Sequence, residues 1–269
     1  MNRLTRRRMM SLSAGSLLGA GLWPGRLFAR ETETKPFRFV VVNDWHVVGE
    51  TCQPWFDTVV KSMKAHSPTI DFVLMNGDLS EDGTAKQLDR AKEILKSLGV
   101  PCHAVPGNHD YQKPDNRKVY DQLFPKQLNY QFEQGGWQFI ALDTTEGTKF
   151  EKVKAGKPTL DWLDENLPQL DKSKPTVLFT HIPLGEGVKM RLANTDAIMD
   201  RLKPFNLAAA FNGHYHAFTE KKIGESIVTT NRCCSHAKSN HDGTKEKGYF
   251  LVDAKDGKLK RQFVEVKKG

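Results

Sequence analysis

Short apolar runs alternate along the chain with longer stretches in which apolar residues recur every three or four positions. The short runs are rich in Val, Ile, Phe and Leu, which is typical of buried strands, and the longer stretches predict amphipathic helices. Strands are predicted at residues 37–43, 70–76, 102–105, 176–180 and 207–211. Helices are predicted at residues 55–66, 84–98, 116–124, 160–170 and 196–205.

Antiparallel strands are predicted in two further regions. Residues 130–144 have the pattern of a hairpin around Gly135-Gly136, and the chain from Ile227 onward has a β pattern with a hairpin turn at Asp256-Gly257. With βα units first and antiparallel strands later, the order predicts an α/β fold. We expect two mixed β-sheets packed face to face, with helices outside.

Composition narrows the class of protein. Of the 269 residues, 38% are hydrophobic and 27% are charged, which is typical of a soluble globular protein rather than a disordered or membrane-embedded one. No segment is apolar over the length that a bilayer requires. We therefore expect one domain, residues 30–269, which follows a short leader. We also expect that no stable membrane span remains once the leader is removed.

The leader, residues 1–29, has the pattern of an export signal. Residues 5–10 read Thr-Arg-Arg-Arg-Met-Met, residues 9–25 are uncharged, and Leu-Phe-Ala follows at residues 27–29. The segment resembles twin-arginine signal peptides, which implies the twin-arginine export machinery as a partner and a periplasmic or otherwise exported location. An uncleaved amino-terminal anchor and a disordered basic tail are the alternatives.

Much of the positive charge lies in this leader. Removing residues 1–29 takes away five arginines and no acidic residue, which lowers the formal net charge from +8 to +3. Because nucleic-acid binding usually needs a clustered basic face, a nucleic-acid partner is not expected.

The four cysteines, at positions 52, 102, 233 and 234, include no Cys-x-x-Cys spacing. A zinc or redox motif is therefore not expected. Buried free thiols and a disulfide are both compatible with export.

Metal-competent side chains follow five of the predicted strands. They are Asp44 and His46; Asp78; Asn108, His109 and Asp110; His181; and His214 and His216. In such sheets, ligands gather at the carboxyl ends of strands. Carboxylate, imidazole and amide donors together suit Mn, Fe, Zn or a similar cation. A lone histidine is more often structural, but five sites that each follow an apolar strand predict one metal-binding pocket.

The order of these motifs resembles the calcineurin-like metallophosphoesterases. The motifs are Asp44-x-His46, Gly77-Asp78, Gly107-Asn108-His109-Asp110, His181 and Gly213-His214-x-His216. The resemblance covers about residues 37–218 and implies a four-layer αββα fold with two divalent metal ions. It also implies that Asp44, His46 and His216 bind the first ion, that Asn108, His181 and His214 bind the second, and that Asp78 bridges the two.

Two such ions suit hydrolysis at phosphorus. They lower the pKa of a shared water, so that a bridging hydroxide attacks, and they hold the attacking and leaving oxygens. His109, assigned to neither ion, is expected to stabilise charge on the phosphate or to protonate the leaving alkoxide. Asp110 is expected either to hold the His109 ring in the required tautomer or to cap a turn. Gly77, Gly107 and Gly213 fit turns with unusual backbone angles.

The flanking residues narrow the activity. Purple acid phosphatases carry a tyrosine three residues after the bridging aspartate, whereas this chain carries Glu81. Residues 77–84, 105–110 and 160–163 resemble class III cyclic-nucleotide phosphodiesterases, so the expected substrate is a small-molecule phosphate ester, most simply a diester. A broad phosphomonoesterase, a nucleotide pyrophosphatase of the same fold and a non-catalytic metal-stabilised binding protein are the alternatives.

Four other side chains have two open interpretations each. Trp45 and Tyr215, which lie between pairs of candidate ligands, either stack on a substrate base or pack around the ligands. His236 and His241, in the polar loop of residues 233–241, either contact phosphate or are solvated.

Overall fold

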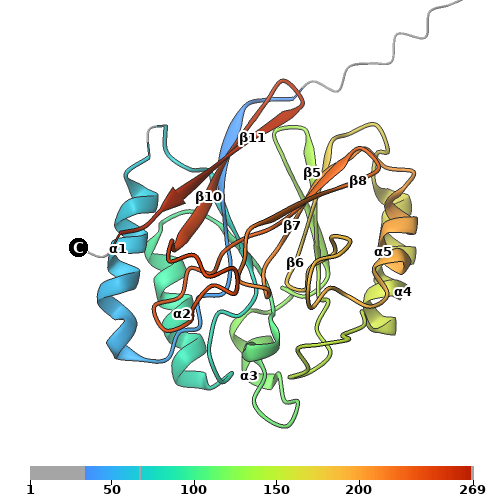
Figure 1. Ribbon diagram of the computed structural model, residues 1–269. Coiled ribbons are helices and arrows are strands. Elements are labelled where there is room, and N and C mark those ends of the chain that lie inside the picture. Colours follow the sequence, from blue (N-terminus) through green and yellow to red (C-terminus); the bar gives the residue numbers. More distant parts are fainter. Residues whose placement is uncertain (1–33, 67, 268–269) are drawn as a thin grey trace, which may run out of the picture. The chain divides into compact units, whose positions relative to one another are not determined.

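Two mixed β-sheets form the core of the residues that the computed structural model describes, 34–66 and 68–267 (Figure 1). The first sheet has the order β11 (Lys258–Glu265), β10 (Gly248–Lys255), β1 (Phe37–Val42), β2 (Phe72–Asn76) and β3 (Cys102–Val105). The second has the order β4 (Tyr130–Gln134), β5 (Trp137–Leu142), β6 (Thr176–Thr180), β7 (Leu207–Asn212), β9 (Ser226–Thr230) and β8 (Thr219–Ile223). The predicted leader lies outside the described residues, so the leader and the domain boundary at residue 30 stay predictions.

Helices cover the outer face of each sheet, as expected. The first sheet carries α1 (Gln53–Lys64), α2 (Ala85–Ser97) and α3 (Lys118–Leu123), and the second carries α4 (Lys157–Asn166) and α5 (Thr195–Leu202). Short 3-10 turns occupy Glu50–Cys52, Asn108–Asp110 and Leu167–Gln169. In Figure 1, α1 and α2 lie on one side of the paired sheets and α4 and α5 on the other.

Alternating side chains of β1 show how the layers form. Phe39 and Val41 point into the cluster between the sheets, whereas Val40 and Val42 point into the cluster under α1 and α2. Successive strand residues face opposite sides, so a strand that is apolar throughout is buried on both faces. Phe39 stacks on Phe72 of the neighbouring strand at 5.0 Å between ring centroids. The expected αββα order of layers is confirmed.

Each predicted strand and helix is present, with shifts at the ends, but β8 is missing from the prediction. Its sequence, Thr-Glu-Lys-Lys-Ile, is mostly polar, and Glu220, Lys221 and Lys222 are exposed. The strand lies at the edge of its sheet, where charged side chains deter pairing with other chains. An edge strand of this kind lacks the apolar alternation that predicts strands.

Parallel pairing sets the position of the candidate ligands. β1, β2 and β3 run parallel in the first sheet, and β5, β6, β7 and β9 run parallel in the second. The residues that follow β1, β2 and β3 therefore emerge at one edge of the first sheet, and those that follow β6 and β7 at one edge of the second.

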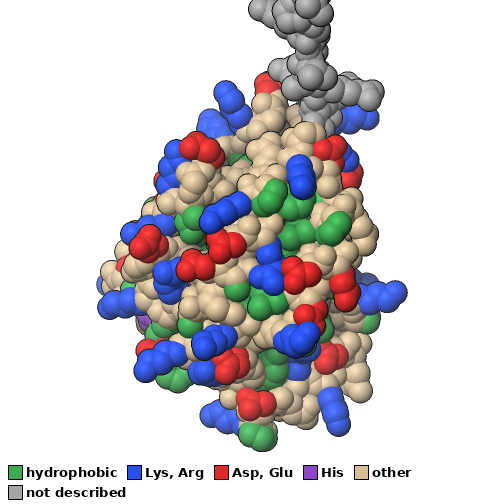
Figure 2. Space-filling model, turned by 90° about the vertical axis from the view of Figure 1, so that its right-hand side faces the viewer, with side chains coloured by type: hydrophobic (Ala, Val, Ile, Leu, Met, Phe, Trp, Pro, Cys, Tyr) green, Lys and Arg blue, Asp and Glu red, His purple; other side chains and the backbone are tan. Residues whose placement is uncertain are grey.

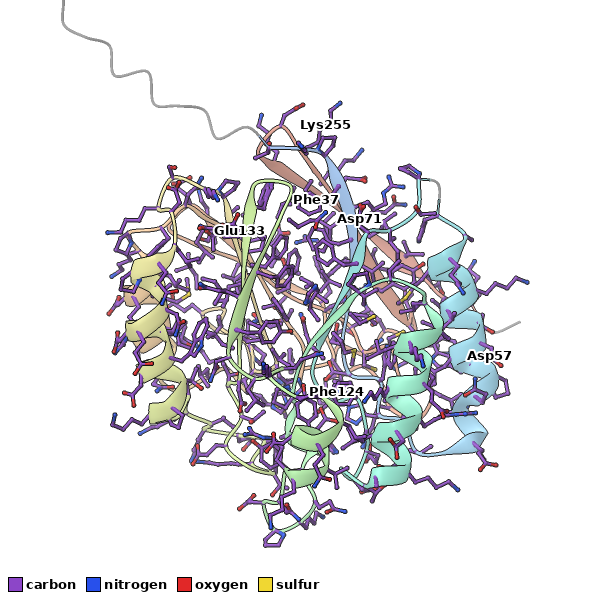
Figure 3. The ribbon with its side chains drawn as sticks, turned by 180° about the vertical axis from the view of Figure 1, so that it is seen from behind. Phe37, Asp57, Asp71, Phe124, Glu133 and Lys255 are labelled. Atoms are coloured by element: carbon purple, nitrogen blue, oxygen red, sulfur yellow. The ribbon has the colours of Figure 1, made fainter. Side chains whose placement is uncertain are left out.

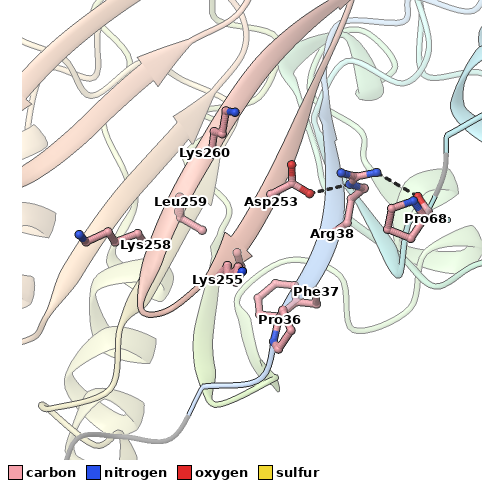
Figure 4. A pocket seen from close by; sticks show the side chains of 10 residues that line it. Pro36, Phe37, Arg38, Pro68, Asp253, Lys255, Lys258, Leu259 and Lys260 are labelled. Atoms are coloured by element: carbon pink, nitrogen blue, oxygen red, sulfur yellow. Dashed lines mark hydrogen bonds and ion pairs between the residues drawn. The ribbon is translucent and has the colours of Figure 1, made fainter.

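A cavity of about 620 Å³ lies at the opposite end of β1, between the start of that strand and the hairpin that joins β10 to β11 (Figure 4). Arg38 donates there to Asp253 at 2.6 Å and to the carbonyl of Pro68 at 3.1 Å. The lining includes none of the candidate ligands.

Charges of both signs are interspersed on the face that carries α4 and α5 (Figure 2). Asp57 points outward from α1, while apolar side chains fill the space between the layers (Figure 3). In the part of the chain that the structure covers, no helix has the length and apolar character to cross a membrane. The four cysteines are free thiols, and all but Cys102 are buried, which agrees with the free-thiol interpretation.

Candidate metal centre

The motifs that follow the five strands converge into two overlapping groups of donor atoms. Asp44, His46, Asp78 and His216 form the first group, and Asp78, His181 and His214 form the second. Within each group, one donor atom from every residue lies within 4.8 Å of the others. Asp78 belongs to both groups. The seven predicted ligands include Asn108, whose Oδ1 lies 3.2 Å from Nε2 of His181.

The Asp78 carboxylate extends one oxygen to each group. Oδ2 lies 3.4 Å from Nε2 of His46, and Oδ1 lies 3.4 Å from Nε2 of His181. In the first group, Oδ1 of Asp44 lies 3.4 Å from Nε2 of His216. Both Asp44 oxygens also accept the backbone N–H of His214, at 3.1 and 3.0 Å. The position of the Asp78 carboxylate, with one oxygen toward each group, is the arrangement expected of a carboxylate that bridges two cations.

Hydrogen bonds fix the orientation of the four histidines in these groups. The contacts are His46 Nδ1 to Glu81 Oε2 at 2.8 Å, His181 Nδ1 to the Asn76 carbonyl at 2.9 Å, His214 Nε2 to the Phe150 carbonyl at 2.8 Å and His216 Nδ1 to the Ser239 carbonyl at 3.3 Å. Each acceptor assigns the ring proton to the nitrogen that faces it. In the neutral form of each ring, the other nitrogen presents its lone pair to the centre, as in histidine metal ligands.

Two pairs of these nitrogens face each other. Nε2 of His46 lies 3.1 Å from Nε2 of His216, and Nδ1 of His214 lies 3.2 Å from Nε2 of His181. Lone pairs at that distance repel unless a positive charge lies nearby. Burial works to lower the pKa of His216, but the charge of Asp44 outweighs it and raises the pKa to about 11. Burial and the neighbouring His181 lower the pKa of His214 to about 4. A proton on His216 can satisfy the first pair, and a cation in its place would be coordinated by both nitrogens and the nearby carboxylates.

Strained backbone places five of the seven candidate ligands. Asp44, His46, Asp78, His214 and His216 have positive φ, between 46° and 68°. This left-handed conformation is uncommon for residues other than glycine and costs on the order of 1–3 kcal/mol each. Strain of this kind concentrates at functional sites, where the surrounding fold enforces it.

The three motif glycines have two different roles. Gly77 has φ +79°, as the sequence predicts for a turn, but Gly107 and Gly213 lie outside the positive-φ region. At Gly107 the requirement is space, because a Cβ there would lie 2.1 Å from Oδ1 of Asp78. A Cβ on Gly213 would lie 2.9 Å from Oδ2 of Asp44. The expectation of unusual angles is therefore wrong for these two, which allow the backbone to approach the carboxylates.

His109 lies beside both groups and belongs to neither, but with His46 and Glu81 it forms a third set of donor atoms that lie within 4.8 Å of one another. Its Nδ1 faces the Glu81 carbonyl at 2.8 Å, which leaves Nε2 directed elsewhere, and its backbone N–H donates to Oδ1 of Asp78 at 2.9 Å. Burial works to lower its pKa, but the charge of Asp78 and the Glu81 carbonyl outweigh burial and raise the pKa above the ordinary value. The side chain is 33% exposed. It can therefore meet a bound molecule.

Asp110 does not orient the His109 ring. Its Oδ1 accepts the N–H and hydroxyl of Ser80 at 2.8 and 2.9 Å, and its Oδ2 accepts the N–H of Leu79 and Gly107 at 3.2 and 2.9 Å. Since Nδ1 of His109 is held by Glu81, the turn-capping interpretation is correct and the tautomer interpretation is wrong. Burial and the nearby charge of Asp78 raise the pKa of Asp110 to about 6.

Glu81 is a site residue that the sequence does not reveal. Its carboxylate binds Nδ1 of His46 and Nζ of Lys238, and its carbonyl binds His109. Burial works to raise its pKa, but the hydrogen bonds from His46 and Lys238 lower it to about 2. Lys238 is 157 positions away along the chain, so no local pattern indicates this contact. Glu81 links the first group to His109.

A pocket of about 250 Å³, here called the inner pocket, opens over the two groups. Besides candidate ligands and His109, its lining includes Phe150, Met190, Lys238 and His241. The His241 ring stacks on His216 at 5.2 Å, which places it in the pocket, whereas His236 is exposed.

Trp45 lies outside the inner pocket. It is fully buried in the cluster under α1 and contacts Phe56 at 5.1 Å, so it packs rather than stacks on substrate. Tyr215 is partly buried and lies 5.7 Å from His241, which leaves both of its interpretations open.

Comparison with known proteins places this site in a family. Residues 37–218 match the model of the family described as calcineurin-like phosphoesterase. A 3′,5′-cyclic-nucleotide phosphodiesterase from a Nostoc species is 28% identical over 56% of this chain and 59% of its own length. A 3′,5′-cyclic adenosine monophosphate phosphodiesterase from Pseudomonas aeruginosa is 25% identical over 76% of this chain and 77% of its own length.

The fold has a solved counterpart as well. A purple acid phosphatase from yellow lupin seeds superposes with a TM-score of 0.65 over 87% of this chain and 52% of that one, at 14% identity. The family match over residues 37–218 agrees with the two donor groups that share Asp78. The chain belongs to the calcineurin-like phosphoesterase family.

Proposed function

We propose that this protein is a phosphodiesterase that uses two divalent cations. The observation that carries the proposal is the pair of donor groups that share one carboxylate, with His109 beside them and outside both. The relatives named as cyclic-nucleotide phosphodiesterases support a diester as the substrate.

The residues present fit two cations. Asp44, His46 and His216 would hold one, Asn108, His181 and His214 the other, and Asp78 would contact both. The facing imidazole nitrogens, 3.1 and 3.2 Å apart, are close enough for both members of each pair to coordinate one cation. Mixed oxygen and nitrogen donors suit Mn, Fe or Zn.

The protein's own residues then position the ester for displacement at phosphorus. When bound, a pair of cations lowers the pKa of a coordinated water and neutralises charge on the phosphoryl oxygens. His109 offers Nε2 to the departing oxygen, since Nδ1 is held by the Glu81 carbonyl. As the bond from phosphorus to that oxygen breaks, the alkoxide takes a proton from His109, and the oxygen of water forms the new bond to phosphorus. Lys238, which lines the inner pocket and pairs with Glu81, lies near the phosphate.

Hydrolysis of two matched esters tests the proposal. Protein stripped of metal and reloaded with Mn, Fe or Zn should hydrolyse bis-p-nitrophenyl phosphate faster than p-nitrophenyl phosphate, and His109→Ala should slow diester hydrolysis by about 10²- to 10⁴-fold. A preference for the monoester would indicate a phosphomonoesterase instead. Metal binding without turnover of either compound would contradict the enzymatic proposal.

We also propose that the protein is exported by the twin-arginine route. The support is the sequence of residues 5–10 and the uncharged stretch after it. Export of a folded protein would allow the cations to be bound before transport.

A further inference from the structure

A second pocket adjoins the inner pocket. This outer pocket has a volume of about 520 Å³, and Tyr111, Lys113 and Thr148 line it without lining the inner pocket. Asn108, His109 and Phe150 line both pockets, so the two spaces meet at these three residues. A molecule seated over the donor groups can therefore extend past His109 into the outer pocket.

Two loops tied to each other form the wall of the outer pocket. The Tyr111 hydroxyl bonds to the Thr145 hydroxyl at 2.8 Å, and the backbone N–H of Thr148 donates to Oδ1 of Asp115 at 2.8 Å. The loops are so close at Gly147 that a Cβ there would lie 2.1 Å from Oδ1 of Asp115. Such contacts hold the wall in place before a ligand arrives, which reduces the entropy lost on binding.

Phe150 presents an aromatic face where the pockets meet. Its side chain is 56% exposed, and its backbone carbonyl accepts Nε2 of His214 at 2.8 Å. The backbone that carries the ring is therefore fixed to a candidate ligand. An exposed aromatic ring at a pocket offers a flat apolar surface on which another ring can pack.

Among the charged side chains that line the outer pocket, Lys113 can contact an anionic group of a ligand. Glu81 is engaged by His46 and Lys238, and Asp82 accepts Nε2 of Gln87 at 3.1 Å. Lys113 is exposed and takes part in none of the ion pairs found among the described residues. The pocket thus combines an aromatic surface with the ammonium of Lys113 and the carboxylate of Asp82, which is held by Gln87.

We propose that the outer pocket binds the departing alcohol of the ester as a flat ring packed on Phe150, with an anionic substituent toward Lys113. This inference rests on the proposed function, in which His109 protonates the departing oxygen. Because His109 stands between the pockets, the alcohol that receives its proton extends to the outer side. The part of the substrate that stays bonded to phosphorus then lies on the side of Met190 and His241.

Binding of two phosphonates to the full-length, Mn-loaded protein tests the inference without turnover. Phenylphosphonate should bind about tenfold more tightly than methylphosphonate by calorimetry, because its ring is removed from water against Phe150. Phe150→Ala should bring the two affinities to within about twofold while methylphosphonate binding is unchanged. Phe218→Ala is the matched control, since Phe218 is 42% exposed and lines neither pocket, and it should keep the preference.

A variant of Lys113 tests whether the ring of the bound phosphonate lies in the outer pocket. Lys113→Glu should weaken 4-carboxyphenylphosphonate about fivefold, as expected for an exposed ion pair, and leave phenylphosphonate unchanged. A phenyl preference that survives in Phe150→Ala, or equal binding of the carboxylated probe to Lys113→Glu, would overturn the inference. A protein that keeps both effects and hydrolyses no ester would support the pocket and contradict the proposed function. Diester hydrolysis without a phenyl preference would contradict the pocket alone.

Discussion

The facing imidazole nitrogens show how single residues prepare the site. Each ring is oriented by an acceptor on its outer side, and three of the four acceptors are backbone carbonyls. The exception is His46, which depends on the carboxylate of Glu81. The outer acceptors thus aim the inner nitrogens at the centre.

Removing the charge of Glu81 should loosen the metal bound at His46. Glu81→Gln leaves the backbone carbonyl that holds His109 but replaces the carboxylate, so the affinity for the first cation should fall about 10- to 100-fold. Titration with Mn monitored by calorimetry measures this. Glu93→Gln, on the exposed face of α2, is the control. Equal affinity in both variants would show that Glu81 does not support the metal site.

Site residues that stand in short sequence motifs can be predicted from the sequence. The seven candidate ligands and His109 stand in short motifs directly after apolar strands, so their types and spacing indicate a metal site, while the family resemblance implies the role of each residue. The sequence does not predict the role of Glu81, because Lys238 reaches it across 157 positions. For Asp110 the sequence leaves two roles open, because Ser80 reaches it across 30 positions. Phe150 is likewise tied to His214 across 64 positions.

At the scale of elements, the loops that follow the parallel strands contain both the residues with positive φ and the side chains that form the donor groups. The apolar strands are rigid because both faces are buried, and the left-handed turns that follow them aim the side chains. The same burial makes these strands predictable from sequence, whereas the polar edge strand β8 gives no such pattern.

A methyl group at Gly107 should disrupt this arrangement. In Gly107→Ala the added Cβ would collide with the side chain and backbone N of Asp78, so we expect a loss of about 1–3 kcal/mol in the free energy of unfolding together with weaker metal binding. Chemical denaturation measures the first effect. Gly156→Ala is the control, since its nearest contact would be 3.5 Å, and it should change stability by less than about 0.5 kcal/mol. Similar stability for both variants would contradict the role assigned to Gly107.

At the scale of the whole molecule, we propose from the predicted leader and the candidate metal centre that the protein folds before it is exported. Replacing Arg6 and Arg7 together by lysine should abolish export in a bacterial host with the twin-arginine machinery, because that machinery reads the arginine pair. Cell fractionation and immunoblotting locate the protein, and Arg26→Lys should leave export intact. Export of the double variant at the normal level would rule out this route.

The central claim is that one carboxylate, Asp78, joins two metal sites. Elemental analysis of active protein beside Asp78→Asn tests it most directly, with Asp57→Asn, on the exposed side of α1, as the control. We predict two divalent cations per chain in the active protein and in the control, and at most one in Asp78→Asn, with diester hydrolysis lowered at least about 100-fold. Active protein without bound cations, or an Asp78→Asn variant that keeps two cations and full activity, would contradict the account.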